Sequence, residues 1–182
     1  MSENIVILSG SPRKKGNTER LTAAFIEGAK AAGKHVTLFR TAEMTISGCK
    51  GCMHCTKEKG VCIQKDDMSA ILEALQEADA LVLASPVYFF DITAQLKLAI
   101  DRLYALIPLL GTGVSIKKSA LLMTCGAASQ EVAEGAVTIY KNICSNAKWE
   151  DAGKIIATGL INPGDIDEHV ELARARILGQ EI

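Results

Sequence analysis

The stretch of residues 4–18 reads Asn4-Ile5-Val6-Ile7-Leu8-Ser9-Gly10-Ser11-Pro12-Arg13-Lys14-Lys15-Gly16-Asn17-Thr18. It begins with a nearly continuous apolar run, which is typical of a strand buried on both faces of a parallel sheet. The loop from Ser9 to Thr18 then supplies hydroxyl groups, two glycines and a cationic run, and an apolar helical pattern follows it. The free N–H groups at the start of a helix favour an anion. The stretch therefore predicts a strand, a phosphate-binding loop and a helix.

Short apolar runs and helical patterns alternate along the rest of the chain, without a repeat or a low-complexity segment. After a first helix that ends at Gly33, the predicted strands are 35–40, 80–84, 119–124 and 155–161. The predicted helices that follow them run from 66 or 67 to about 76, 96–107, 132–143 and 166–177. Right-handed crossovers put helices on both faces of such a sheet, so we predict an α/β fold with a five-stranded parallel sheet in the order 2-1-3-4-5.

Composition and charge limit what this chain can do. With 182 residues, 48% hydrophobic and 23% charged, it has the composition of one packed domain, 1–182, with a cysteine-rich insertion at about 44–65. A formal net charge of −1 gives no long-range attraction to nucleic acid or to an anionic membrane, so we expect neither as a partner. The first residues, Met1-Ser2-Glu3-Asn4, contain no basic stretch before an apolar run, and we expect a cytoplasmic protein.

Other phosphate-site motifs fit the first loop less well. A nucleotide-triphosphate loop needs Lys-Ser/Thr after its second glycine, but Gly16 is followed by Asn17-Thr18. The dinucleotide fingerprint needs three glycines at fixed spacing, and the loop has two. A phosphoacceptor receiver domain would need acidic residues where Ser9-Gly10-Ser11 and Ser85-Pro86 stand. An ordinary strand-to-helix turn capped by Asn17 or Thr18 remains the alternative.

In doubly wound sheets, ligands bind beyond the carboxyl ends of the strands, where the winding reverses. The loops 9–18, 85–92 and 125–130 are therefore expected to share one rim. The cysteine-rich segment also follows a strand, the second, so topology predicts that it stands at the same rim beside the first loop.

The motifs Gly10-Ser11-Pro12-Arg13, Gly16-Asn17-Thr18 and Ser85-Pro86-Val87-Tyr88 resemble those of the NAD(P)H-dependent FMN reductase and iron-sulfur flavoprotein group of the flavodoxin-like superfamily. The resemblance covers nearly the whole chain and implies a flavodoxin-like three-layer sandwich. It implies an FMN phosphate site in the first loop and an isoalloxazine wall in the loop after the third strand. The implied phosphate-site residues are Ser9, Ser11, Arg13, Gly16, Asn17 and Thr18, and the implied wall residues are Pro86, Val87, Tyr88 and Phe89.

Two further observations bear on a flavin site. The run Pro86-Val87-Tyr88-Phe89-Phe90 puts three aromatic residues in one loop of a chain with only four Phe, three Tyr and one Trp. A flat ring could lie there, although a hydrophobic plug under the helix from Thr93 is the alternative. After the fourth strand, Cys125 and Gly126 are small enough for backbone N–H groups to reach the flavin carbonyls.

Four of the six cysteines, spaced Cys49-x2-Cys52-x2-Cys55-x6-Cys62, predict a metal or redox site. Two-residue gaps let consecutive thiolates turn toward one cubane, and the longer gap lets the chain return with the fourth ligand. The spacing resembles the compact motif of iron-sulfur flavoproteins, which implies one [4Fe–4S] cluster. Zinc, with four thiolates or three and His54, and no metal at all remain as alternatives.

Other candidate residues have simpler interpretations. We expect Cys125 and Cys144 to be small buried apolar residues. Asp66-Asp67 is expected to cap a helix, and Asp101-Arg102 to make helix-surface or subunit contacts.

These observations leave three functions open. The leading hypothesis is an oxidoreductase in which FMN accepts a hydride from NAD(P)H, as a co-substrate, and passes electrons to a quinone, free flavin or another small acceptor. The alternative is an iron-sulfur flavoprotein that passes single electrons between a [4Fe–4S] cluster, FMN and a ferredoxin-like partner. The third is a non-enzymatic binding module with a zinc-stabilised loop. The resemblance also implies a homodimer or homotetramer.

Overall fold

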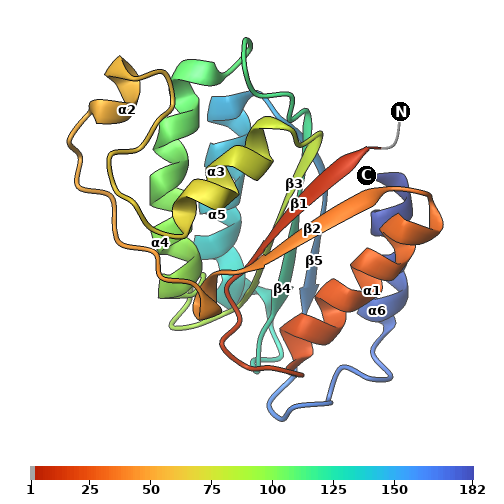
Figure 1. Cartoon of the computed structure of the whole chain (residues 1–182). Coiled ribbons are helices and arrows are strands. Elements are labelled where there is room, and N and C mark those ends of the chain that lie inside the picture. Colours follow the sequence, from red (N-terminus) through yellow and green to blue (C-terminus); the bar gives the residue numbers. More distant parts are fainter. Residues whose placement is uncertain (1–2) are drawn as a thin grey trace.

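Five parallel strands form one sheet in the order β2-β1-β3-β4-β5, as predicted (Figure 1). The computed structural model describes residues 3–182, so Met1 and Ser2, on which the expectation about a targeting signal partly rests, lie outside it. The strands are β1 (Asn4–Ser9), β2 (His35–Arg40), β3 (Ala80–Pro86), β4 (Lys118–Thr124) and β5 (Glu150–Ala157). Within the described range, no helix combines the length and the apolar character needed to cross a membrane.

Helices cover both faces of the sheet and make a flavodoxin-like three-layer sandwich (Figure 1). One face carries α1 (Asn17–Ala31) and α6 (Val170–Glu181). The other carries α3 (Met68–Gln76), α4 (Ala94–Arg102) and α5 (Glu134–Ala147). The short elements are α2 (His54–Lys57) and the 3-10 turns η1 (Thr41–Glu43), η2 (Leu103–Leu109) and η3 (Gln130–Ala133).

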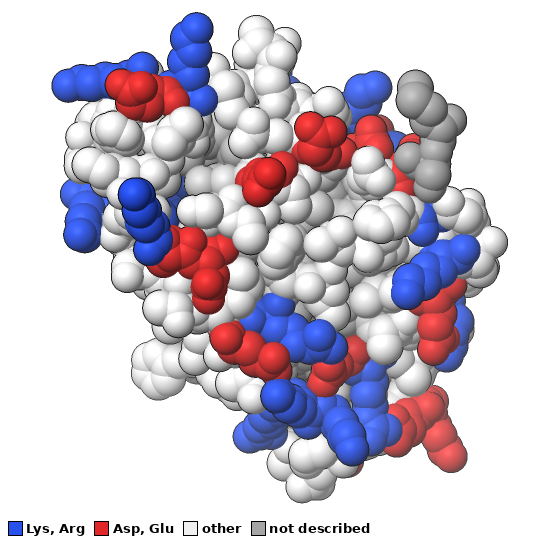
Figure 2. Space-filling model, viewed as in Figure 1, with Lys and Arg blue, Asp and Glu red and all other residues white. Residues whose placement is uncertain are grey.

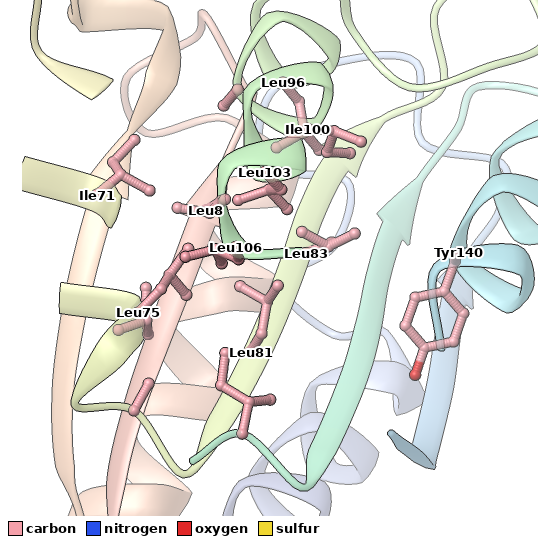
Figure 3. Packing of buried hydrophobic residues seen from close by; sticks show 14 of the residues in the cluster. Leu8, Ile71, Leu75, Leu81, Leu83, Leu96, Ile100, Leu103, Leu106 and Tyr140 are labelled. Atoms are coloured by element: carbon pink, nitrogen blue, oxygen red, sulfur yellow. The ribbon is translucent and has the colours of Figure 1, made fainter. Parts of the chain in front are cut away.

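The central strand β1 supplies residues to both halves of the core. Val6 and Leu8 pack with residues of α3, α4 and α5, whereas Ile5 and Ile7 pack with residues of α1 and α6. Side chains alternate between the faces of a strand, so only a strand covered on both sides is apolar at every position. Figure 3 shows Leu8 and Leu83 against Ile100 and the other apolar residues of α4 and η2.

The predicted fifth strand, 155–161, is wrong at both ends. The strand begins at Glu150, because an edge strand tolerates polar residues, and Asp151 accepts a hydrogen bond from the buried Tyr140 hydroxyl at 2.8 Å. It ends at Ala157, after which Leu160 N–H donates to the carbonyl of Cys125 at 2.9 Å. Residues 158–161 therefore form part of the rim at the carboxyl ends of the strands.

The apolar residues Ile166, Val170, Ala173 and Ile177 predict an amphipathic closing helix at 166–177, but the helix is displaced and this apolar face is wrong. The helix runs from Val170 to Glu181, and its buried residues are Glu171, Ala175 and Gly179. Val170 and Ile177 are exposed. Small residues face α1 because the two helix backbones approach each other closely: a Cβ on Gly28 would lie 1.9 Å from the carbonyl oxygen of Arg176.

The cysteine-rich segment does not stand beside the first loop, and that prediction is wrong. It leaves the rim after β2 and η1, but α2 lies near the other end of the sheet, against η2 (Figure 1). At Gly60, with φ of 91°, a Cβ would lie 2.6 Å from Leu109, so the tip of the segment packs closely on η2. The direction of a strand fixes where a long loop begins and leaves its course open.

Replacing Gly28 or Gly179 with Ala tests the close approach of α1 and α6. Ala normally stabilises a helix interior relative to Gly. Here we expect each variant to lower the free energy of unfolding by about 1–3 kcal/mol, because the new methyl group overpacks a backbone contact. Urea unfolding measures the change. The control is Ala23→Gly at an exposed position of α1, which reports helix propensity alone, and a gain in stability in the Gly→Ala variants would contradict the packing.

Candidate functional site

A cavity of about 290 Å³ lies at the rim where the loops after β1, β3 and β4 meet. It is enclosed by ten of the twelve residues that the sequence proposed for a flavin. These ten are Ser11, Arg13, Gly16, Asn17, Thr18, Pro86, Val87, Tyr88, Cys125 and Gly126. Ser9 is buried beside it and lines a smaller adjoining crevice, and Phe89 lies outside it.

The loop after β1 is fixed at its start by contact with α4. Gly10 N–H donates to the carbonyl of Ala84 at 2.8 Å, and Thr93 Oγ1 donates to the carbonyl of Gly10 at 2.9 Å. A Cβ on Gly10 would lie 2.2 Å from Thr93 Oγ1, so a larger residue would push the loop away from α4. This glycine sets the position of the whole loop against β3 and α4.

The N-terminus of α1 opens toward the cavity without a side-chain cap. Gly16 is the N-cap residue, and no described side chain accepts a hydrogen bond in the capping position. The alternative in which Asn17 or Thr18 caps an ordinary turn is therefore wrong. The Asn17 side chain instead holds the loop after β5, because it donates to the carbonyl of Asn162 at 2.8 Å and accepts from Gly164 N–H at 3.0 Å.

Two buried hydroxyl groups line the floor of the cavity. Thr18 and Thr124 are 2% and 4% exposed, and their Oγ1 atoms are 2.6 Å apart. One hydroxyl must donate to the other, so the proton of the acceptor is directed elsewhere. A ligand oxygen in the cavity would satisfy that second donor.

Basic side chains, interleaved with acidic ones, surround the loop after β1. Figure 2 shows Lys and Arg side chains together with Asp and Glu side chains at the lower edge of the molecule, where Figure 1 places the loop between β1 and α1. Arg40 donates from Nε to Glu19 at 3.1 Å, and Lys15 N–H donates to the same carboxylate at 2.6 Å. Burial alone would raise the pKa of Glu19, but these hydrogen bonds and the nearby charges lower it. The carboxylate of Glu19 is thus paired with Arg40. Arg13 lines the cavity, and none of the described ion pairs gives it an acidic partner.

The aromatic loop divides between the cavity and the surface. Tyr88 and Asp91 exchange backbone hydrogen bonds of 2.9 and 3.1 Å and close a tight turn. Its two central residues, Phe89 and Phe90, have positive φ of 47° and 72°, which is a strained conformation for bulky side chains. Phe89 is 96% exposed and its ring packs edge-on against that of Phe90. The alternative of a hydrophobic plug is therefore wrong for these two residues.

The sequence prediction missed three residues of the cavity: Thr124, Leu160 and Ile161. Thr124 is the last residue of β4, so the rule that ligands bind at the carboxyl ends of strands could have identified it. Leu160 and Ile161 had been assigned to the fifth strand, and the wrong end of that strand concealed them.

A second cavity, of about 390 Å³, lies on the side of the molecule that carries the clustered cysteines. Cys49, Cys52, Cys55 and Cys62 all line it, together with residues from the end of α4 and from η2. Cys49 and Cys52 are exposed, and the other two are half-buried. Burial is the main cause that raises the pKa of Cys55. Among residues 3–182, no three His, Cys, Asp or Glu side chains lie close enough together to hold a metal ion.

A buried ion pair closes the base of this cysteine segment. Arg102 donates from Nη1 and Nη2 to the Asp66 carboxylate at 2.9 and 3.0 Å, and also from Nη1 to the carbonyl of Ser47 at 2.8 Å. Ser47 N–H donates to the same carboxylate at 2.9 Å. The side chain of Arg102 is only 1% exposed, so the prediction that Asp101-Arg102 makes surface contacts is wrong for Arg102.

The carboxylate of Asp66 does more than cap α3. It accepts the N–H of Met68 at 3.3 Å, as a helix-capping group does, but its main partner is the guanidinium of Arg102. Burial alone would raise the pKa of Asp66, and the hydrogen bonds from Arg102 and Ser47 lower it below its usual value.

The remaining cysteines and one histidine have structural roles. Cys125 and Cys144 are buried, as expected. The N–H of Cys125 donates to the carbonyl of Ala157 at 2.9 Å, so this backbone group joins the chain after β4 to the end of β5. The ring of His169 accepts the N–H of Glu171 at 3.2 Å through Nδ1 and caps α6, a role that the sequence analysis did not identify.

Known proteins that are similar to this chain are flavoproteins and FMN reductases. The sequence model of the NADPH-dependent FMN reductase family matches residues 4–146. An iron-sulfur flavoprotein of Archaeoglobus fulgidus is 40% identical over 94 residues, which are 52% of this chain and 42% of that protein. An iron-sulfur flavoprotein of Clostridioides difficile is 28% identical over 173 residues, 92% of this chain and 72% of that protein. The chain spans about half the length of the Archaeoglobus and Methanocaldococcus relatives it matches.

A solved structure shows the same fold. The NAD(P)H:quinone oxidoreductase from Methanothermobacter marburgensis superimposes with a TM-score of 0.79 at 23% identity, covering 99% of this chain and 96% of that chain. At this level of identity the likeness concerns the fold.

Replacing Asp66 with Asn tests the buried ion pair. A carboxylate with a lowered pKa stabilises the fold above its unfolded-state pKa of about 3.9, and this contribution is lost as the pH falls through the lower folded value. We expect the Asn variant to lose about 3–5 kcal/mol at neutral pH, because Arg102 is left buried without its partner.

The measurement is urea unfolding of both proteins between about pH 7 and about pH 2. Below about pH 4, the stability of the wild type should fall more steeply than that of the variant. Asp167→Asn, which removes the partner of Arg20 from an exposed ion pair, is the matched control and should change stability little. Parallel pH curves for the wild type and the Asp66 variant would contradict the role given to this carboxylate.

Proposed function

The chain belongs to the NADPH-dependent FMN reductase family, and on that premise we propose that it binds FMN in the rim cavity and acts as an FMN-dependent oxidoreductase. The reductant is a reduced nicotinamide, and the acceptor is a quinone, a flavin or another small molecule. The observation that carries this proposal is the uncapped N-terminus of α1, which opens into a cavity enclosed by three rim loops.

The residues of the cavity fit the phosphate end of FMN. A Cβ on Gly16 would lie 3.0 Å from the Cβ of Arg13, so the glycine keeps open the space at the start of the helix. Free N–H groups there favour an anion, and Arg13 adds a positive charge. The spare hydroxyl proton of the Thr18 and Thr124 pair provides a further donor.

FMN, when bound, supplies the hydride-accepting and electron-releasing chemistry, so the chain needs no nucleophile or acid of its own. The residues of the chain bind and orient the group. Arg13 and the start of α1 hold its phosphate, and Pro86, Val87 and Tyr88 form the wall against which a flat ring packs. The Asn17 bridge fixes the loop after β5, which places Leu160 and Ile161 on the opposite wall.

Arg13→Gln tests the phosphate site. A hydrogen bond to a charged group contributes about 1.5–3 kcal/mol, so the dissociation constant for FMN should rise by about ten- to a hundredfold. Fluorescence titration of the apoprotein measures it. Riboflavin, which has no phosphate, should bind the variant and the wild type equally.

Lys30→Gln is the control for this prediction. It removes the same charge at the opposite end of α1 and should leave FMN affinity unchanged. An equal loss of FMN and riboflavin affinity in Arg13→Gln would show that Arg13 does not bind the phosphate.

A second candidate function is favoured by the cysteine cavity. We propose that Cys49, Cys52, Cys55 and Cys62 hold one [4Fe–4S] cluster, as in the iron-sulfur flavoproteins that the chain resembles, with a ferredoxin-like protein as electron partner. The support is that all four thiols line one cavity and form a soft donor set suited to iron-sulfur clusters or to zinc. Binding requires the four thiols to be drawn together across the cavity.

The cluster, when bound, supplies single-electron exchange. The four thiols of the chain hold it. Its contact with water is limited because Cys55 and Cys62 are half-buried and because Tyr104 and Ala105 of η2 line the cavity. A cytoplasmic location and assembly into a homodimer or homotetramer belong to the same proposal.

Cys62→Ser tests the cysteine site. After anaerobic reconstitution with iron and sulfide, the wild type should contain iron and sulfide in equal amounts and show the brown absorbance of a cluster. The variant should lose most of both, because one thiolate ligand is missing. Cys144→Ser, at a buried cysteine of α5, is the control and should bind iron as the wild type does. Uptake of zinc without uptake of iron and sulfide would contradict the cluster and support the zinc-stabilised loop.

A further inference from the structure

The neck of the cysteine segment, defined as residues 45–48 and 64–67, is closed by hydrogen bonds that involve no thiol. Asp67 N–H donates to the carbonyl of Thr45 at 3.1 Å, and Thr45 N–H donates to the Asp67 carboxylate at 2.6 Å. Gln64 Nε2 donates to the carbonyl of Gly48 at 3.1 Å. Asp66 and Ser47 complete the neck through their bonds with Arg102.

Arg102 has more donors than this neck uses. Its Nη atoms are occupied by Asp66 and Ser47, but Nε is buried and has no hydrogen-bond partner among residues 3–182. A buried, unpaired donor is costly, so it marks a place where a partner is missing.

Arg102 lines the same cavity as the four clustered cysteines, Cys62 among them. Its side chain is only 1% exposed, and a guanidinium stays protonated in proteins, so it brings a buried positive charge to the wall of this cavity.

We propose that Arg102 is a positioning residue for the cysteine-bound cluster: its guanidinium, held by Asp66 and Ser47, places a buried positive charge beside the cluster, and its unpaired Nε donates a hydrogen bond to one of the cysteine sulfurs that line the same cavity. This inference rests on the second candidate function proposed above. Hydrogen bonds to the sulfur ligands and the local net charge set the potential of such clusters. Arg102 therefore favours the reduced, more negative form, and Asp66 opposes it.

The test compares midpoint potentials of the reconstituted whole chain, followed spectroscopically, in the wild type, Arg102→Gln and Asp66→Asn. Removing the positive charge should lower the ratio of reduced to oxidised cluster at a fixed potential by about tenfold or more, which is about 59 mV for a one-electron couple. Removing the negative charge should shift the ratio in the opposite direction. Lys97→Gln, at an exposed residue of α4, should cause no shift.

Opposite shifts distinguish this role from a structural one. Both substitutions break the same ion pair, so a residue that only closed the neck would give shifts of the same sign in both variants, or none, and either result would overturn the inference. If Arg102→Gln does not fold, Arg102→Lys replaces it: it keeps the charge and loses the planar donor group. It should shift the ratio in the same direction as Arg102→Gln, by a smaller factor, and an unchanged or raised ratio would overturn the inference.

Iron and sulfide content separates this inference from the proposed function. A wild type that takes up no cluster refutes both. A wild type that takes up the cluster, with unchanged potentials in the Arg102 and Asp66 variants, refutes the inference alone and leaves the cysteine site standing.

Discussion

The parallel pairing of β1 with both β2 and β3 is the constraint on which the rest of this structure depends. Because β1 runs parallel to both neighbours, the carboxyl ends of all three strands meet at one rim. That rim receives the loop with Arg13, the loop after β3 and the loop after β4. No single loop could enclose a flat cofactor with a charged tail, but three loops delivered to one place can do so.

The order and type of the main elements followed from the sequence, because the apolar pattern of each strand reports directly on how it is covered. The ends of elements were less predictable where packing overrides pattern. β5 lies at the edge of the sheet, so its polar first residues looked like a loop. In α6 the exposed Val170 and Ile177 suggested a buried face, but the helix meets α1 through Ala175 and Gly179, and small residues give no hydrophobic signal.

The candidate sites show the same division. Most of the rim cavity was predictable, because its residues stand immediately after strands and a short loop stays near the strand that precedes it. The cysteine segment is long, and its course is set by contacts at Gly60 and Arg102 that no local sequence pattern predicts. The two cavities share no lining residue, so the clustered cysteines and the rim loops line separate sites.

The neck of the cysteine segment has a consequence for how this protein folds. Its hydrogen bonds and the Arg102–Asp66 pair order the base of the segment without using any of the four thiols. The chain can therefore complete its sheet and its core without a bond to any of these thiols, while Cys49 and Cys52 stay exposed at the surface. The folding of the scaffold is then independent of the chemical state of the four thiols.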